Sequence, residues 1–439
     1  MEGSHSESWT IMRSDIDNAM HGITRRDLIA AGAGVTAAFF SGCRLLPLRE
    51  DGYSVPLLGD IHYDRPPIDV FHSEFRRLHI DDGMFARYKT EFESFSSMWG
   101  KDGRSAALVA ASGKVRRSDA AFALQLGDLI EGDCESPALH ERMFADACAL
   151  MKRTYGDDLP IVTLAGNHDV RRGDDRLGEY DSYSRMSAAW HAKELGVEVA
   201  GPTFSFRQGP DLWIVADFNR PDVALVEKLL EQSMNSRYTF FCTHGAVLTS
   251  GNRSPRRWFF LGGPQYDKSG HAMKSEFGKA HPQWDKARRR IRGLLARRNA
   301  IVLSGHSHCL ELRDWYGDGG RITEFVMNSV TKTARGNDVP ERPVVVGDRP
   351  EDFGRCRLSP NAKPNAAVEA LYAEYEPGMR RYYTANATGH ARLLVSEGSV
   401  VAEFFPGSSL LPCETFKIRC HSEPCACCGI YGFARTAAE

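Results

Sequence analysis

The stretch IVTLAGNHD, residues 161–169, joins an apolar run to the polar tetrapeptide Gly-Asn-His-Asp. A short run of branched apolar residues that ends near a glycine predicts a buried β-strand. The polar residues follow the carboxyl end of that strand, which is where open α/β sheets bind their ligands. The stretch therefore predicts one strand of a buried sheet and one part of a polar site.

Four further motifs repeat this pattern along the chain. They are GDIHYD at 59–64, GDLIEGD at 127–133, THG at 243–245 and GHSH at 305–308. Apolar runs that predict strands precede them at 55–58, 121–126, 238–242 and 300–304. Helical patterns lie between the motifs at 85–99, 138–154, 223–232 and 284–299. Strands that alternate with helices predict an α/β fold with helices on both faces of its sheet.

Together the motifs supply the carboxylate, amide and imidazole groups of a two-metal hydrolytic centre, and such centres act on phosphate esters. Each motif alone is typical of an ordinary turn at a strand end. A single histidine in such a place, for example His244, is more often a hydrogen-bonded structural residue. The five motifs in this order favour the metal centre over these alternatives.

In their order, the motifs resemble the pattern DxH, GD, GNH(D/E), H and GHxH of the calcineurin-like metallophosphoesterase superfamily, over residues 55–328. The resemblance implies an α/β fold of the four-layer αββα sandwich type, with metals at the strand ends. It implies that one metal is bound by Asp60, His62, Asp128 and His308. The second metal would be bound by Asn167, His244, His306 and the bridging Asp128. In one departure from many members, Gly245 follows His244, where they carry a glycine before the histidine.

His168 matches the histidine of this family that contacts the substrate, so the resemblance implies that it stabilises or protonates the leaving group. An unperturbed imidazole titrates near pH 6.5, which suits that role at neutral pH. Two roles are open for the adjacent Asp169. It either orients the ring of His168 for catalysis or caps the turn.

The charge of the proposed centre fits an anionic ester. Two carboxylates on two divalent ions leave about +2, and a bridging hydroxide lowers this to about +1. Water on such ions has its pKa lowered to about 7 and supplies hydroxide for in-line attack. Asp, Asn and His ligands suit Mn, Fe and Zn alike.

Two other functions stay open. A nuclease or cyclic-nucleotide phosphodiesterase would use the same site, although the formal charge of −2 makes no electrostatic case for nucleic acid. The second alternative function is a metal-holding interaction module without catalysis. Tight metal binding without turnover would identify it. We expect a small-molecule phosphate ester, a monoester or a diester, as the substrate.

The N-terminal sequence predicts export. TRRDLI at 24–29, a mildly apolar stretch at 30–40 and Ser-Gly-Cys at 41–43 resemble a twin-arginine signal that ends in a lipoprotein-type cysteine. We expect the twin-arginine machinery to deliver the protein to the periplasm, either free or anchored through a lipid on Cys43. An ordinary cleaved signal with an incidental Cys43 is the alternative, and Met20 would begin a signal of ordinary length.

We divide the chain into an N-terminal extension and signal at 1–43, a phosphoesterase domain at 52–410 and a cysteine-rich tail at 411–439. Five of the 11 cysteines lie in that tail, where disulfides and a zinc site are both open. Cys242 and Cys309 lie in apolar contexts and are expected to be buried thiols. Residues 400–405 read as an outer strand.

Two arginine-containing stretches follow motif-bearing strands and are expected to rim the site. The first, 171–185, contains Arg171, Arg172, Arg176 and Arg185, and the second spans 249–283. An arginine in either loop could bind a phosphate through two parallel hydrogen bonds. A solvated surface is the alternative for each of them. The arginine-rich stretch 286–298 reads as an amphipathic surface helix that covers the sheet.

Overall fold

The chain divides into two units, Met1–Arg44 and Leu45–Glu439. The computed structural model describes parts of the second unit, namely residues 52–64, 103–132, 134, 136–172, 177–248, 282–330, 345–347 and 373–420. The expected signal at 1–43, the expected helix at 85–99, most of the loop 249–283 and the end of the tail lie outside these residues. Within them, no helix has the length and the apolar character needed to cross a membrane.

Six strands form the first sheet, in the order β14-β13-β12-β1-β2-β3. Three of them are neighbouring parallel strands, which are β1 (Tyr53–Leu58), β2 (Ala123–Gln125) and β3 (Ile161–Thr163). The sheet is extended by antiparallel pairing through β12 (Gly389–Val395), β13 (Ser399–Pro406) and β14 (Glu414–Cys420). The motif-bearing strands therefore lie together at one side of this sheet.

Eight strands form the second sheet, in the order β10-β11-β8-β9-β7-β6-β5-β4. At its centre β5 (Asp211–Ala216), β6 (Thr239–Thr243), β7 (Ile301–Ser304) and β9 (Gly320–Val326) run parallel. The others pair antiparallel and are β4 (Phe204–Gln208), β8 (Leu310–Gly317), β10 (Val345–Gly347) and β11 (Met379–Ala385).

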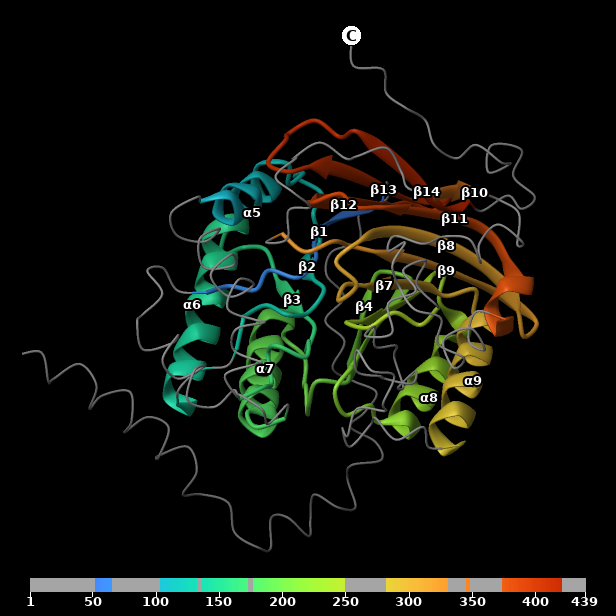
Figure 1. The fold of residues 1–439 in the computed structure, drawn as a ribbon, viewed down its shortest axis with the longest axis horizontal. Coiled ribbons are helices and arrows are strands. Elements are labelled where there is room, and N and C mark those ends of the chain that lie inside the picture. Colours follow the sequence, from blue (N-terminus) through green and yellow to red (C-terminus); the bar gives the residue numbers. More distant parts are fainter. Residues whose placement is uncertain are drawn as a thin grey trace, which may run out of the picture. The chain divides into compact units, whose positions relative to one another are not determined.

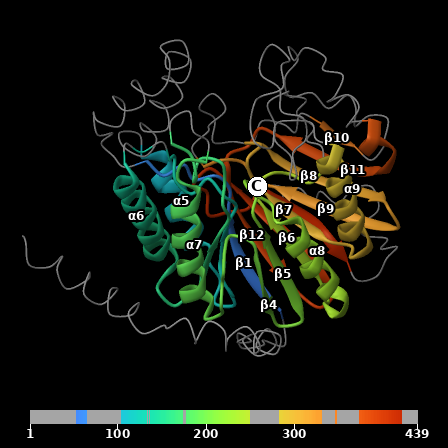
Figure 2. The ribbon, with the colours of Figure 1, turned by 90° about the horizontal axis from the view of Figure 1, so that it is seen from below.

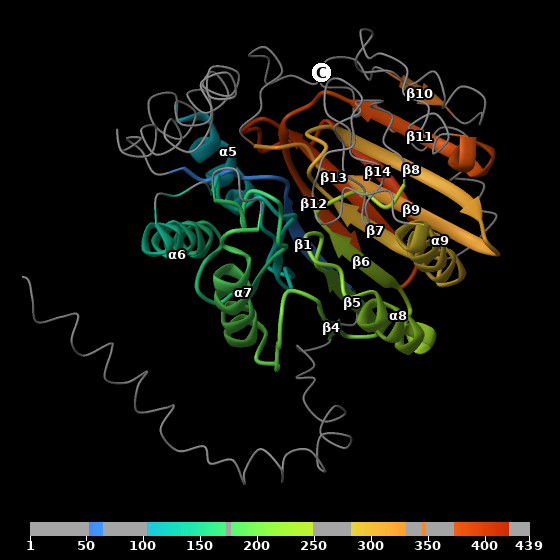
Figure 3. The same ribbon diagram turned by 60° about the horizontal axis from the view of Figure 1, so that its bottom comes forward.

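Helices cover the outer face of each sheet (Figures 1 and 2). On the first sheet lie α5 (Arg104–Lys114), α6 (Pro137–Tyr155) and α7 (Tyr180–Leu195). On the second lie α8 (Val223–Glu231) and α9 (Pro282–Arg297), side by side in Figure 3. Two short 3-10 helices, Gln232–Asn235 and Glu376–Gly378, join elements of the second sheet. The four-layer αββα sandwich predicted from the sequence is confirmed.

A core of apolar side chains fills the space between the two sheets. The rings of Trp213 on β5 and Phe240 on β6 stack with their centroids 3.9 Å apart, and Phe122 meets Trp213 edge to face at 4.8 Å. The apolar runs before the motifs are buried on both faces because this core lies on one side and helices lie on the other. That explains why these strands read as continuous rather than alternating apolar runs.

Local signals account for the helix ends. Ser136 caps α6 because its hydroxyl accepts a hydrogen bond from the backbone amide of Leu139, and Pro137 occupies the first turn. Asp222 caps α8 in the same way through the amide of Leu225. Serine and aspartate at these positions satisfy amides that have no partner within the helix.

The structure differs from the sequence expectations in three places. β13 is not an outer strand, because β14 pairs with its free side, and β14 itself lies within the segment we had assigned to the tail. The helices α5 and α7 and the strands β4, β5, β8, β9 and β10 were not foreseen. α9 covers the second sheet as expected, but Arg288 and Arg292 are buried and bind Glu374 instead of facing water.

Candidate metal centre

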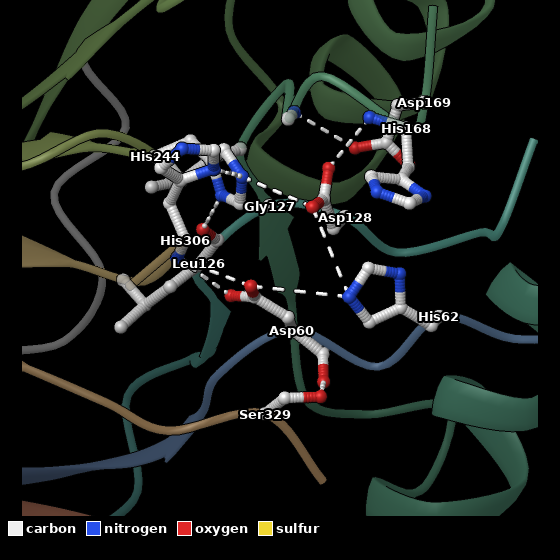
Figure 4. A network of polar contacts seen from close by, with 12 residues as sticks. Asp60, His62, Leu126, Gly127, Asp128, His168, Asp169, His244, His306 and Ser329 are labelled. Carbon is white, nitrogen blue, oxygen red and sulfur yellow. Dashed lines mark hydrogen bonds and ion pairs between the residues drawn. The ribbon is translucent and has the colours of Figure 1, made fainter. Parts of the chain in front are cut away.

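All the predicted ligands follow strands whose carboxyl ends meet at one edge of the sandwich. Figure 4 shows Asp60, His62, Asp128, His244 and His306 close together at this edge. On the first sheet, the motifs GDIHYD, GDLIEGD and GNHD follow β1, β2 and β3. On the second sheet, His244 follows β6, and the motif GHSH follows β7. Neighbouring parallel strands end at the same edge, so residues far apart in the sequence come together here.

The residues gather in two groups, on either side of Asp128. In the first, Nε2 of His308 lies 2.9 Å from Oδ2 of Asp60 and 3.1 Å from Nε2 of His62. In the second, Nε2 of His244 lies 3.2 Å from Oδ2 of Asp128 and 3.2 Å from Nδ1 of His306. Because Oδ2 of Asp128 is also 3.9 Å from Nε2 of His62, Asp128 lies between the groups, in the position expected of a bridge.

Asn167 lies next to this bridge. The backbone amide of the following residue, His168, donates to Oδ1 of Asp128 at 2.7 Å. The side-chain oxygen of Asn167 is buried and has no hydrogen-bond partner among the described residues. A buried amide oxygen without a donor costs free energy unless something else binds it. A cation would satisfy this oxygen, so Asn167 fits the ligand role that we expected.

The ring nitrogens of His62 and His244 are set for metal binding. Nδ1 of His62 lies 2.9 Å from Oε2 of Glu131, and Nδ1 of His244 lies 2.7 Å from the carbonyl oxygen of Leu126. An oxygen acceptor at Nδ1 keeps the proton there and leaves the Nε2 lone pair directed into the site. Both Nε2 atoms face the carboxylates Asp60 or Asp128, which suits a shared cation.

The pKa values of the site histidines also indicate a metal centre. Burial alone would lower the pKa of His62, but Glu131, Asp128 and Asp60 raise it to about 9. The pKa of His244 is likewise raised to about 9, by Asp128 and Asp60 against the effect of burial. Carboxylates that stabilise a proton on these rings also stabilise a divalent cation in its place. The residues therefore fit a metal centre.

Four of these residues have a left-handed backbone. The φ angles are 46° at His62, 51° at Asp128, 61° at His306 and 47° at His308. A residue other than glycine in this region costs about 1–3 kcal/mol and persists only where its surroundings enforce it. Such strain collects at functional sites, and here it turns the ligand side chains inward immediately after their strands end.

A family model described as calcineurin-like phosphoesterase matches residues 54–310 of the chain. The chain belongs to this family. It is therefore a hydrolase that acts on phosphate esters, and its clustered Asp and His residues indicate divalent metal ions. No curated protein sequence matches the chain.

Solved structures are similar to this chain at low sequence identity. A purple acid phosphatase from yellow lupin (Lupinus luteus) seeds is 11% identical with a TM-score of 0.45, and the match covers 85% of this chain and 54% of the lupin chain. A structure of PhoD is 11% identical with a TM-score of 0.43, covering 85% of this chain and 72% of its own. A dimetal phosphatase from Danio rerio is 10% identical with a TM-score of 0.39, and the match covers 85% of this chain and 100% of the Danio rerio chain.

Glu131, within the motif GDLIEGD of this phosphoesterase, is a site residue that the sequence reading missed. Its fully buried carboxylate lies 2.9 Å from Nδ1 of His62 and 3.2 Å from Nδ1 of His168, and it accepts a hydrogen bond from Arg171 at 2.9 Å. Burial would raise the pKa of Glu131, but His168, His62 and Arg171 hold it well below its usual range. Glu131 thus orients both a predicted ligand and the predicted catalytic histidine.

Asp169 takes the turn-cap role rather than the ring-orienting role. Its carboxylate accepts hydrogen bonds from the backbone amides of Ile130 at 3.0 Å and Gly166 at 2.8 Å. It joins the loops after β2 and β3, while Glu131 contacts the ring of His168. Burial and the neighbouring Asp128 raise the pKa of Asp169 to about 7.

The unusual glycine after His244 is explained by Phe218. A Cβ atom on Gly245 would lie 2.1 Å from Cε2 of Phe218. That ring packs against both histidines of the second group, with centroids 5.5 Å from His244 and 5.2 Å from His306. The absence of a side chain at Gly245 lets the aromatic ring approach the site.

Buried charges of β8 and β9 hold the loop that follows His244. Glu324 on β9 accepts hydrogen bonds from the backbone amides of Val247 at 2.7 Å and Leu248 at 3.1 Å. Arg313 on β8 donates to the carbonyl of Leu248 at 2.7 Å and lies 3.4 Å from Glu324. Cys242 and Cys309 are buried thiols, as the sequence predicted.

Proposed function

We propose that this chain hydrolyses phosphate monoesters or diesters at a dinuclear centre. The observation that carries the proposal is the convergence of Asp60, His62 and His308 on one side of Asp128 and of His244 and His306 on the other. Two divalent ions, Mn, Fe or Zn, would supply positive charge for the phosphate and hydroxide from water for in-line attack.

The residues of the chain have distinct tasks in this proposal. Asp60 and Asp128 are buried carboxylates, and the pKa of Asp128 is held well below its usual range by His244 and His168 although burial opposes this. Asp128 therefore stays ionised at neutral pH. His168 is 16% exposed, and Oε2 of Glu131 lies 3.2 Å from Nδ1 of its ring. Its Nε2 is the atom that would donate a proton to the leaving oxygen.

The decisive experiment combines metal analysis of the folded protein with hydrolysis of one generic monoester and one generic diester. We expect two ions per chain and turnover of at least one ester. Tight metal binding without turnover of either would favour the non-catalytic metal-holding module. A single ion per chain with full activity would contradict the dinuclear centre.

We also propose that the protein is exported by the twin-arginine machinery. The support is the TRRDLI sequence, the apolar stretch behind it and Cys43. The double change Arg25→Lys and Arg26→Lys preserves charge and helix propensity, so a merely electrostatic role should survive it. We expect the enzyme to accumulate inside the cell with its signal attached, and normal export would refute the proposal. Loss of detergent partitioning in Cys43→Ala would indicate a lipid anchor.

A further inference from the structure

Two adjacent arginines follow the motif GNHD, and the structure gives them different surroundings. Nη2 of Arg171 donates to Oε1 of Glu131 at 2.9 Å, and its Nη1 lies 3.2 Å from Nε2 of His168. Arg172 instead pairs with Glu179, which directly precedes α7. Arg171 therefore lies beside the predicted catalytic histidine, whereas its neighbour faces a helix end.

The position of Arg171 is built into the fold. Its partner Glu131 is fully buried, while the Arg171 side chain is 20% exposed. Gly132 has a φ of +65°, and a Cβ atom there would lie 2.0 Å from the carbonyl oxygen of His168 and 3.6 Å from Cγ of Arg171. A side chain at Gly132 would thus push apart the loops that bring the guanidinium to the ring of His168.

We propose that Arg171 binds a phosphate oxygen and makes the enzyme prefer phosphate monoesters to diesters. The inference rests on the proposed function, because it takes His168 as the residue that meets the leaving oxygen. Glu131 accepts from Nη2, and Nη1 lies 3.2 Å from Nε2 of His168, so Nη1 and a protonated Nε2 are neighbouring donors. A phosphate whose leaving oxygen accepts the proton of Nε2 can place a second oxygen against the Nη1 hydrogens of Arg171.

The preference follows from charge. Above pH 7 the terminal phosphate of a monoester carries about two negative charges, since its second pKa is about 6. A diester carries one charge and has a substituent on a further oxygen. Guanidinium groups form their strongest hydrogen bonds with charged, unsubstituted phosphate oxygens. Arg171 therefore stabilises a bound monoester more than a bound diester.

The test measures binding as well as turnover, in the metal-loaded full chain at pH 8. The probes are inorganic phosphate, which is a dianion, and dimethyl phosphate, a singly charged diester. We expect Arg171→Met to weaken calorimetric binding of inorganic phosphate by about 10–100-fold, the range for hydrogen bonds to charged groups. Binding of dimethyl phosphate should change by less than about threefold, and kcat/KM should fall more for a monoester than for a diester. The matched control Arg172→Met should leave all of these values unchanged.

Metal content separates this role from an effect through Glu131. Arg171→Lys keeps a positive charge beside Glu131 but loses the forked hydrogen-bond donors of the guanidinium. This variant should therefore retain full metal and show an intermediate loss of phosphate affinity. The proposal is overturned if either variant, at full metal content, loses affinity for both probes equally or for neither. It is also overturned if both variants lose metal, because Arg171 would then act on the ligands. Failure of the unsubstituted protein to hydrolyse any ester would refute the proposed function instead.

Discussion

The two halves of the metal centre are supported in different ways. On the side of the first sheet, the side chains are held by groups within the motifs themselves. Asp169 caps amides of two motif loops, and Glu131 contacts both His62 and His168. On the side of the second sheet, the loop after His244 is held by Glu324 of β9, which lies 77 residues from Val247 in the sequence.

This difference separates local from long-range support. The first half can be recognised from short motifs because each motif carries both ligands and the groups that orient them. The second half shows only its ligands in the motifs, while its support comes from strands that read as ordinary core. Mutations should therefore affect the halves differently, and Asp128, which lies between them, should affect both.

The largest effect is expected from Asp128→Ala. Removing the carboxylate between the two groups takes a ligand from both ions and increases their mutual repulsion. We expect activity to be abolished and bound metal to fall, as measured by elemental analysis of the purified variant. Two metals per chain with near-normal turnover would contradict the bridging role.

The next largest effect is expected from His168→Ala, on the first-sheet side. The variant should retain its metals, because His168 is oriented by Glu131 and is not among the predicted ligands. Turnover should fall by about 10²–10⁴-fold, the usual contribution of a general acid or base. The loss should be smaller for esters with good leaving groups, which need little protonation. A metal-free His168→Ala protein would show that this role is wrong.

The residues that would bind metal were easier to predict from the sequence than the residues that hold them in place. The motifs identified every residue of the two groups on either side of Asp128, because strand ends and metal-ligand chemistry are both visible locally. Glu131 was missed although it lies inside a motif. Glu131 lies in a loop in which Asp128 and Gly132 have positive φ angles of 51° and 65°, and sequence spacing does not reveal the path of such a loop.

The fold shows the same limit. Apolar runs alternating with helical patterns predicted the layers. Strands β1, β2, β3, β6 and β7 lie where these runs predicted them, but β4, β5, β8 and β9 were not foreseen. In β14 the alternation of buried Phe416 and Ile418 was a usable signal, but the cysteines around it favoured a tail. Arg288 and Arg292 were expected to face water, since their partner Glu374 lies more than 80 residues away.

Glu324→Gln tests the long-range support directly. An amide can accept only one of the two backbone hydrogen bonds, and it also removes the charge beside Arg313. Groups that position metal ligands contribute about 10–100-fold to metal affinity. We expect a loss of this size, measured by competition with a chelator, and we expect it in the ion bound by His244 and His306.

The matched control is Asp314→Asn. Like Glu324, Asp314 is a buried carboxylate, but it lies on β8. It binds Arg321, Thr323 and Arg381. As the neighbour of Arg313 in a strand, it points to the opposite face of the sheet, away from the loop after His244. Equal losses of metal affinity in the two variants would mean that general destabilisation, and not the loop, causes the effect.

The smallest effect is expected from Gly245→Ala, which crowds the His244 and His306 side of the centre without removing any polar group. The new methyl group would clash with the ring of Phe218, which packs against His244 and His306. Such overpacking costs about 1–3 kcal/mol, so the free energy of unfolding should fall by that amount while metal affinity falls by less than about tenfold. Gly398→Ala, where a Cβ atom would meet nothing within 4 Å, should be neutral.

Adding Phe218→Leu should restore part of the stability lost in Gly245→Ala, because the smaller side chain leaves room for the methyl group. If the double variant were no more stable than the sum of the two single losses implies, the contact with Phe218 would not be the reason for the glycine at this position.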